Sequence, residues 1–309
     1  MKRTPWLKYL PVIVACSCFA PVALTHAYPA DPVQIAQSGT DYDSYMRLGY
    51  SATAKRDYPT ALLNFKKAQN LRPNNRYASN AVSNVSSYIA NGGESKVSFV
   101  PPNLGAPASG TRQGGATRGR CLSGNQSSLL TALVPATNQG MTTAEYPVLF
   151  FYVPQTAAKT LEFSLLDKND KKIYQTTVAP SQTPGIVGLN LSSMKGLKPL
   201  ESGKDYHWFL TIVCDAKERS ADIVVDGWVQ RTETDPVFAS ELKKIKPRDR
   251  VSLYTVNGLW YDALATLSET RQSNPNNAVV ANEWTDLLKS VGLEKIAKEP
   301  LIPCCTVRN

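Results

Sequence analysis

Two histidines, His26 and His207, are the only imidazole side chains that this sequence offers for acid–base or metal chemistry. A Ser-His-Asp triad would have to use His207, because we expect His26 to leave with an export signal, and no Gly-x-Ser-x-Gly motif supplies the serine. A single remaining histidine also excludes a multi-histidine metal site and a zinc-protease helix motif. We therefore expect no enzyme activity, no metal site and no cofactor, and we interpret His207 as a packing or surface residue of a strand.

Two further segments resemble ligand-binding loops, but each lacks a required residue. Residues 196–204 contain a Gly-Lys pair, yet Asp205 stands where a phosphate-binding loop needs Ser or Thr. Asp167, Asn169 and Asp170 resemble a calcium loop, but its glycine and its distal glutamate are missing. A turn before a strand explains the first segment, and a hairpin turn explains the second.

Four large aromatic side chains lie near the ends of predicted elements, where peptide- or sugar-binding surfaces are often found. They are Trp228, Tyr254, Trp260 and Tyr261. These residues are our candidates for a binding site. In the alternative interpretation, they form the seam between a β domain and a C-terminal helix pair.

Four of the six cysteines would remain after cleavage of an export signal: Cys121, Cys214, Cys304 and Cys305. An even number in an exported protein indicates disulfides, and four cysteines allow three complete pairings. Direct pairing of Cys304 with Cys305 would place their Cα atoms about 3.8 Å apart, below the usual span of about 4.4–6.8 Å. We therefore predict that Cys304 and Cys305 bond to Cys121 and Cys214, which would tie the C-terminal tail to the β domain.

Residues 1–27 have the three parts of a cleaved export signal. Three basic residues precede an apolar run over residues 10–24, and Thr25-His26-Ala27 offers small residues at the cleavage positions. The run is about 15 residues long, shorter than the roughly 20 that a membrane-spanning helix needs. The sequence therefore predicts a periplasmic or secreted protein without a transmembrane segment after cleavage. The alternative is a lipoprotein anchored through Cys16, because residues 13–16 resemble a lipoprotein cleavage box.

The formal net charge of +9 falls to +6 once the predicted signal is removed. The remaining excess is concentrated in residues 112–120 and 241–250. In a cytosolic protein such segments would suggest nucleic acid, which an exported protein rarely meets. We expect no nucleic-acid partner and interpret these segments as solvated surface or as contacts to acidic envelope polymers.

Two segments 202 residues apart share the signature of a tetratricopeptide repeat. The counterparts of Tyr58, Ala61, Leu62 and Phe65 are Trp260, Ala263, Leu264 and Leu267, and both copies end in Pro-Asn-Asn. Each copy predicts an antiparallel helix pair, in which small residues such as Gly49 allow close approach, followed by one more helix. Such pairs cannot bury their faces alone. We expect them to pack on each other, on the middle of the chain or on a partner.

The middle of the chain has a different pattern. Residues 91–120 are rich in Gly, Pro and Arg and predict a linker or an extended arm, of which roughly residues 105–119 are expected to be mobile. Seven short β-branched or aromatic runs follow between residues 129 and 231, separated by turn residues. This spacing predicts an antiparallel β-sandwich. Alternation along residues 206–214 places Trp208 on the inward face and His207 on the other.

Short motifs in the β region and the C-terminal part resemble one family. They are Arg118-Gly119-Arg120-Cys121, Tyr152-Val153-Pro154, Thr183-Pro184-Gly185-Ile186-Val187, Pro199-Leu200-Glu201-Ser202-Gly203-Lys204, Tyr206-His207-Trp208, Cys214-Asp215 with Arg219-Ser220, Gly227-Trp228, Gly258-Leu259-Trp260-Tyr261-Asp262-Ala263-Leu264 and Cys304-Cys305. With these motifs, residues 104–305 resemble domain of unknown function 928, a family found mainly in exported proteins of cyanobacteria. The resemblance implies a compartment and a domain boundary. It implies no activity, because none is assigned to the family.

We therefore predict an α+β protein, in which an antiparallel β-sandwich is flanked by N- and C-terminal tetratricopeptide-like helical hairpins. The expected segments are a signal peptide (1–27), a helical segment (42–90), a linker (91–120), the β-sandwich (121–235) and C-terminal helical hairpins packed on it (236–305). As function, we expect a non-catalytic adaptor that binds another envelope protein. The alternative is a module that binds carbohydrate or cell-wall polymer.

Overall fold

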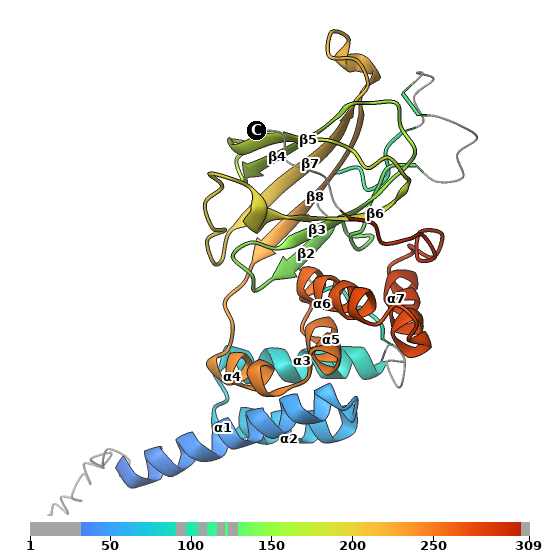
Figure 1. Ribbon diagram of the computed structural model, residues 1–309. Coiled ribbons are helices and arrows are strands. Elements are labelled where there is room, and N and C mark those ends of the chain that lie inside the picture. The colour runs from blue at the N-terminus through green and yellow to red at the C-terminus, as the bar shows by residue number, and fades with distance from the viewer. Residues whose placement is uncertain are drawn as a thin grey trace, which may run out of the picture.

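The computed structural model describes residues 32–90, 97–102, 104, 110–115, 121–122 and 129–303, with side chains from residue 41 onward. The predicted export signal, Cys16, Cys304 and Cys305 lie outside these residues. A β-sandwich forms one end of the molecule, and the helices lie against its other end in successive layers (Figure 1). The chain is therefore an α+β protein, as the sequence predicts. No helix in the described ranges is both long and apolar enough to span a membrane.

The first three helices form the predicted N-terminal hairpin and the helix that covers it. They are α1 (Pro32–Ala54), α2 (Tyr58–Leu71) and α3 (Arg76–Ala90). Gly49 of α1 lies directly on the ring of Phe65 of α2, because a Cβ atom at Gly49 would be 2.4 Å from Phe65 Cε1. Any larger residue at position 49 would push the two helices apart. The glycine thus permits the close approach that the repeat pattern predicts.

The Pro-Asn-Asn tripeptide has the same structural role in both copies of the repeat. The helices α2 and α6 (Trp260–Ser273) end before it, and the helices α3 and α7 (Ala278–Ser290) begin after it. Asn75 Oδ1 and Asn277 Oδ1 each accept hydrogen bonds from two backbone N–H groups of the next helix's first turn. These N–H groups have no partner within their helix, which is why asparagine is favoured at this position.

The strands in the described residues form two sheets that pack face to face. They are β1 (Thr131–Ala132), β2 (Gln139–Thr142), β3 (Val148–Val153), β4 (Thr160–Asp167), β5 (Lys172–Val178), β6 (Gly185–Asn190), β7 (Asp205–Val213) and β8 (Ile223–Arg231), with short 3-10 helices η1 (Leu191–Ser193) and η2 (Arg219–Ala221). The small sheet has the order β1-β3-β6, and the large sheet has the order β2-β8-β7-β4-β5. Between them, Phe151 of β3 packs edge-on against Trp208 of β7, with ring centroids 5.3 Å apart. Trp208 is thus on the inward face, as alternation predicts.

One strand pair departs from the predicted antiparallel pattern. β2 pairs with β8 in parallel, with Gln139 opposite Trp228 and Thr142 opposite Arg231. Parallel neighbours need a long connection, and residues 143–222 provide it. Alternation of apolar residues determines which face of β2 is buried, but it carries no information about the direction of the neighbouring strand. The sequence pattern therefore predicts the sandwich and misses this pairing.

Parts of the predicted linker are built into the fold. The N–H of Gly114 donates to the carbonyl of Leu130 (2.8 Å), and the N–H of Asp226 donates to the carbonyl of Thr111 (3.0 Å). Upstream, Phe99 is buried, and its ring lies 5.0 Å from that of Trp260. Residues 97–99 and 110–115 therefore lie against the fold as an extended arm would, and the expectation of mobility is wrong for residues 110–115. Backbone N–H and C=O groups extend a sheet whatever the side chains are, so a composition poor in apolar residues does not prevent it.

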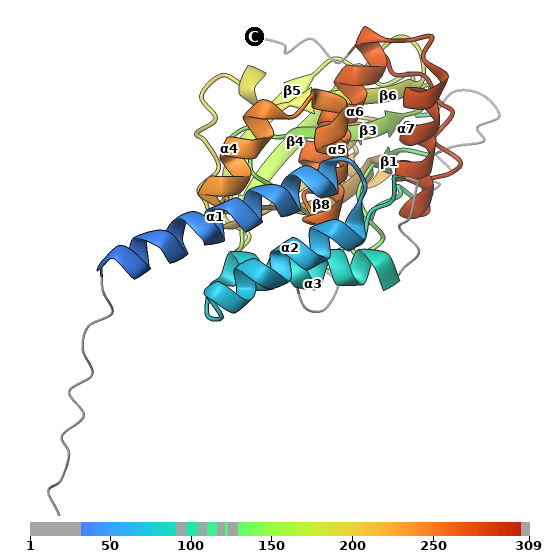
Figure 2. The same cartoon turned by 90° about the horizontal axis from the view of Figure 1, so that it is seen from below.

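The C-terminal helices join the sandwich to the N-terminal helices. α4 (Pro236–Lys244) and most of α5 (Pro247–Val256) share a core with α1–α3, whereas α6 and α7 pack on the sandwich. Figure 2 shows α1 lying against α4 and α5. Glu283 of α7 joins the layers, because its Oε1 lies 2.5 Å from Arg56 Nη2 and 2.9 Å from Arg248 Nη2. The helix pairs therefore bury their faces on each other and on the sandwich.

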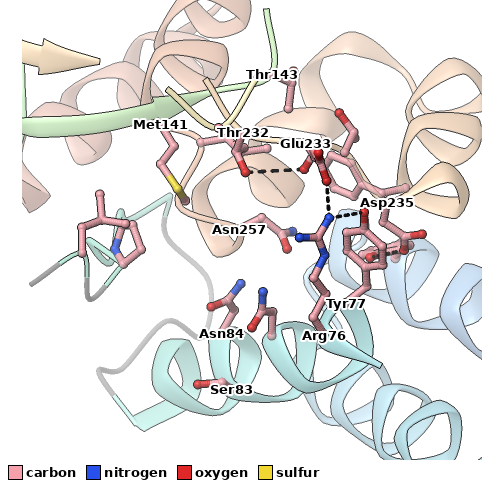
Figure 3. A pocket seen from close by; sticks show the side chains of 18 residues that line it. Arg76, Tyr77, Ser83, Asn84, Met141, Thr143, Thr232, Glu233, Asp235 and Asn257 are labelled. Atoms are coloured by element: carbon pink, nitrogen blue, oxygen red, sulfur yellow. Dashed lines mark hydrogen bonds and ion pairs between the residues drawn. The ribbon is translucent and has the colours of Figure 1, made fainter. Parts of the chain in front are cut away.

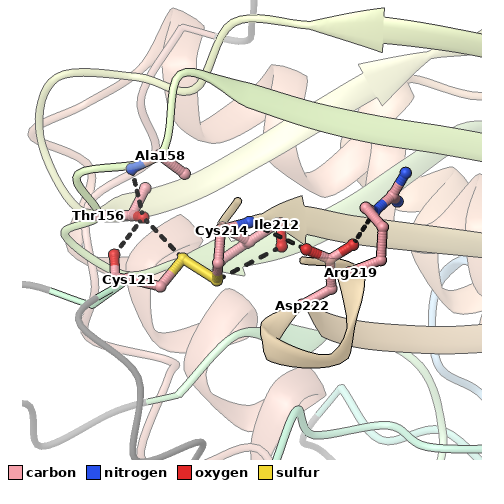
Figure 4. The surroundings of a disulfide bond; sticks show 7 residues. All are labelled: Cys121, Thr156, Ala158, Ile212, Cys214, Arg219 and Asp222. Carbon is pink, nitrogen blue, oxygen red and sulfur yellow. Dashed lines mark hydrogen bonds and ion pairs between the residues drawn. A yellow bond between two sulfur atoms is a disulfide. The ribbon is translucent and has the colours of Figure 1, made fainter. Parts of the chain in front are cut away.

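The disulfide within the described residues joins Cys121 to Cys214, with Cα atoms 5.1 Å apart (Figure 4). The predicted bonds from these two residues to Cys304 and Cys305 are therefore wrong. The backbone of Cys121 is held beside the start of β4, because its carbonyl accepts a hydrogen bond from the N–H of Ala157 (3.1 Å). β4 begins opposite the end of β7, with Thr160 paired to Val213. Strand register thus brings the two cysteines together, and a count of cysteines cannot reveal this.

Candidate functional site

Trp260 and Tyr261 lie in the seam between α6 and the sandwich. Both residues are buried, with 0% and 1% of their surface exposed. Trp260 Nε1 donates to the carbonyl of Leu133 (2.8 Å), and the Tyr261 hydroxyl donates to the carbonyl of Trp228 (2.9 Å). These two residues anchor α6 and are not accessible to a ligand. For them the structure corrects the binding-site hypothesis in favour of the seam interpretation.

The other two aromatic candidates lie in different places. Tyr254 is half-buried in the helical core beside Phe238, with ring centroids 6.5 Å apart, and burial raises the pKa of its hydroxyl to about 12. Trp228 is half-buried on the outward face of β8. The four candidates therefore do not form one surface, and Trp228 lines a hollow on the sandwich that the other three do not line.

A cleft of about 540 Å³ lies between α3 and the adjoining end of the sandwich (Figure 3). We call it the α3 cleft. Its first wall is α3, its second wall is the segment 232–235 that links β8 to α4, and further side chains come from β2 and from the turn between α5 and α6. The lining residues used below are Arg76, Asn80, Ser83 and Asn84 on α3, Glu233 and Asp235 on the second wall, and Met141, Asn257 and Leu259.

The α3 wall carries a row of uncharged polar side chains. Asn80, Ser83 and Asn84 have the i, i+3, i+4 spacing that places side chains on one helical face. Residues on another face of α3, such as Ala81 and Val85, are buried in the helical core. Each asparagine amide supplies two hydrogen-bond donors and an acceptor. Figure 3 shows Asn84 and Asn257 pointing into the cleft from two different elements.

The two walls of the cleft are connected at the rim by an ion pair between Arg76 and Glu233. These side chains are 63% and 60% exposed, so the pair contributes little to stability and can open without a large cost. The second wall is fixed more firmly to α1, because the buried Tyr50 hydroxyl donates to Asp235 Oδ2 (2.8 Å). Burial raises the pKa of Asp235, although the hydrogen bond from Tyr50 acts in the opposite direction. The cleft thus combines a firm wall with a rim that can open.

His207 is buried between the carboxylate of Asp226 and the ring of Trp228. Its Nε2 lies 2.7 Å from Asp226 Oδ2, and its ring stacks on Trp228 with centroids 4.3 Å apart and an interplanar angle of 12°. This is the packing role that the sequence analysis predicts. Over the described ranges, no three His, Cys, Asp or Glu side chains are grouped closely enough to hold a metal ion.

The α3 cleft was not predicted from the sequence. For residues 76–89 the sequence predicts only a helix that covers the first hairpin, which is the role of their apolar stripe. A signal was present in the polar stripe at Asn80, Ser83 and Asn84. It becomes informative only once the fold places a second wall opposite α3.

Comparison with known families shows which family the chain resembles. The family described as Domain of Unknown Function (DUF928) matches residues 113–301, which include the sandwich and the C-terminal helices. Neither the curated proteins nor the solved structures contain a match to the chain. The resemblance seen in the sequence motifs is therefore confirmed. With most of its length covered by this match, the chain belongs to the DUF928 family.

Proposed function

We propose that the protein is an exported, non-catalytic adaptor of the cell envelope or exterior, and that it binds an extended segment of another protein in the α3 cleft. The observation that carries this proposal is the convergence of the Asn80, Asn84 and Asn257 amides on one cleft. An extended peptide presents alternating N–H and C=O groups. Carboxamides both donate and accept hydrogen bonds, so they match such a backbone in either orientation.

The rest of the lining suits a side chain of the bound segment. Met141 and Leu259 supply apolar surface beside the amides, and methionine adapts readily to different shapes. Apolar contacts surrounded by polar groups are typical of protein-binding surfaces. The exposed pair of Arg76 and Glu233 at the rim offers charges of both signs to a partner.

The proposed compartment rests on two independent features. Residues 1–27 have the pattern of an export signal. The bond between Cys121 and Cys214 supports an oxidising environment, because disulfides are rare in proteins that stay in the cytosol. Both features favour the periplasm or the exterior.

The test is capture from the native envelope fraction with three forms of the protein. Asn84→Tyr fills the cleft, whereas Asn70→Tyr makes the same substitution on an exposed position of α2 outside it. We expect a protein retained by the wild type and by Asn70→Tyr but lost with Asn84→Tyr. Binding should then be reproduced with the purified partner. Equal retention by all three forms would place the partner elsewhere, and the absence of any retained protein would contradict the adaptor function.

A further inference from the structure

A second hollow, of about 410 Å³, lies on the outward face of the large sheet. We call it the Trp228 hollow. Its lining includes Trp228 and Gln230 of β8, Gln139 of β2, Asp205 of β7 and Lys168 of the turn between β4 and β5. These elements are consecutive in the sheet order β2-β8-β7-β4, so each neighbouring strand contributes to the wall. The other three aromatic candidates, Tyr254, Trp260 and Tyr261, do not line this hollow.

The indole ring of Trp228 is held in a fixed orientation. His207 lies directly opposite Trp228 in the antiparallel register of β7 and β8, and the two rings stack nearly parallel. Asp226 holds the imidazole in turn, through the 2.7 Å contact between its Oδ2 and Nε2 of His207. Asp226 Oδ1 accepts a hydrogen bond from the N–H of Thr111 (2.6 Å). An aromatic ring supported in this way loses little conformational entropy when a ligand stacks on it.

The polar groups around the ring are also positioned in advance. Gln230 Nε2 donates to Asp205 Oδ1 (2.9 Å), which sets the direction of both side chains. Asp167 Oδ1 accepts hydrogen bonds from the N–H groups of Asn169 (2.8 Å) and Lys171 (3.1 Å), so the turn that carries Lys168 has a defined shape. The hollow therefore surrounds one aromatic ring with amides, a carboxylate and an ammonium group.

The backbone of Trp228 is also held in place by the residue that precedes β2. Asn138 precedes Gln139, and its carbonyl accepts a hydrogen bond from the N–H of Trp228 (3.0 Å). The Asn138 side chain is buried, with 5% of the residue exposed, so this backbone contact is shielded from solvent and fixes the position of Trp228 in the sheet.

From this arrangement we propose that the Trp228 hollow binds a saccharide unit of a neutral polysaccharide. One face of a pyranose ring is covered with C–H bonds and stacks on an indole, which has a large apolar surface. Its hydroxyl groups both donate and accept, so they need a mixture of amide, carboxylate and ammonium partners, which Gln139, Gln230, Asp205 and Lys168 supply.

Other flat ligands fit this chemistry less well. A phosphate-bearing ligand such as a nucleic acid would place its negative charges near Asp205, and among the described lining residues Lys168 alone is basic. A proline-rich peptide also stacks on indole rings, but it presents few donors to the carboxylate and to the amide oxygens. The lining thus favours a ligand with several hydroxyl groups.

The test is calorimetric titration of the purified protein with three soluble probes. They are hexasaccharides of β-1,4-linked glucose, α-1,4-linked glucose and β-1,4-linked N-acetylglucosamine, and a proline-rich decapeptide serves as the rival ligand. We expect at least one hexasaccharide to bind at micromolar to millimolar concentration. Trp228→Ala should weaken that binding at least tenfold, Gln230→Ala should weaken it several-fold, and Trp228→Phe should retain part of it.

The matched control is Tyr174→Ala, which removes a half-buried aromatic ring from β5 outside the hollow and should leave saccharide binding unchanged. Circular dichroism melting of each variant identifies any loss of fold, and Gln230→Ala and Trp228→Phe keep the test decisive if Trp228→Ala does not fold. Failure of all three hexasaccharides to bind the wild type would overturn the proposal. An equal loss of saccharide binding in Trp228→Ala and Tyr174→Ala would also overturn it. The same holds if the decapeptide alone binds and its binding depends on Trp228. None of these outcomes depends on whether a protein binds in the α3 cleft.

Discussion

Removal of the disulfide between Cys121 and Cys214 should lower the stability of the protein by a predictable amount. The two residues are separated by 93 positions in the sequence. In the chain-entropy relation, closing a loop of that length removes about 16 cal/mol/K from the unfolded state, which corresponds to about 4.7 kcal/mol at 25 °C. For a domain of this size, about 2 °C of melting temperature is lost for each kcal/mol. We therefore expect the double variant Cys121→Ala, Cys214→Ala to melt about 9 °C below the wild type.

The control for this experiment is the double variant Cys304→Ala, Cys305→Ala. Melting followed by circular dichroism in the absence of reductant should show the large shift in the first variant only. Addition of a reductant should then lower the melting temperature of the wild type and of the control, but not that of the first variant. Non-reducing peptide mapping should recover one linked peptide that contains Cys121 and Cys214. Equal shifts in the two variants, or a peptide that links Cys214 to the C-terminal tail, would refute the reasoning.

Three further variants test the packing of the helices. Burial alone would raise the pKa of Glu283, but hydrogen bonds from its two arginine partners outweigh burial and lower it. Glu283→Gln should therefore lower the free energy of unfolding by about 2 kcal/mol at neutral pH. This is less than for a fully buried pair, because one of the two arginines is 44% exposed. Urea unfolding should show that the difference between wild type and variant disappears as the pH falls through the lowered pKa of Glu283. Gly49→Ala should cost about 1–3 kcal/mol in the same assay through overlap with the ring on α2, whereas Gly115→Ala, which meets open space, should be neutral. Asn277→Ala should lower the free energy of unfolding by about 1 kcal/mol, because it removes the cap of α7. Asn276→Ala is the control and should be neutral. Equal losses in the two variants would argue against the capping role.

Features encoded by neighbouring residues were predictable from the sequence. Pro-Asn-Asn marks a helix end and the next helix start within three residues, because proline disfavours continuation and asparagine caps the following turn. Gly49 indicates close helix packing, because Gly49 and Phe65 lie on consecutive helices, α1 and α2, that are joined by one short turn. Alternation along β7 separates the buried Trp208 from the outward His207 in the same local way.

Features that depend on distant pairs of strands were not predictable in this way. The partner of Cys214 is set by the ladder of β4 and β7, and the parallel pairing of β2 with β8 is set by a crossover between the sheets. The α3 cleft requires both α3 and the segment 232–235, which are far apart in the sequence. No local pattern records such a meeting. The aromatic candidates illustrate the same point, because only the packing of α6 on the sandwich shows that Trp260 is buried while Trp228 is half-buried on an outward face.

The positions of the two proposed binding surfaces have a consequence for an adaptor. Leu104 lines both the α3 cleft and the Trp228 hollow, and β2 contributes Met141 to the first and Gln139 to the second. The two surfaces therefore adjoin each other across the end of one sheet. The second wall of the cleft follows directly from β8, which carries Trp228, and the N–H of Thr232 donates to the carbonyl of Thr142 in β2 (2.9 Å), so both surfaces are built on the same two strands. A protein segment in the cleft and a saccharide at Trp228 would consequently be held side by side. For an envelope protein attached to a polysaccharide, that proximity makes the second contact intramolecular and strengthens two individually weak interactions.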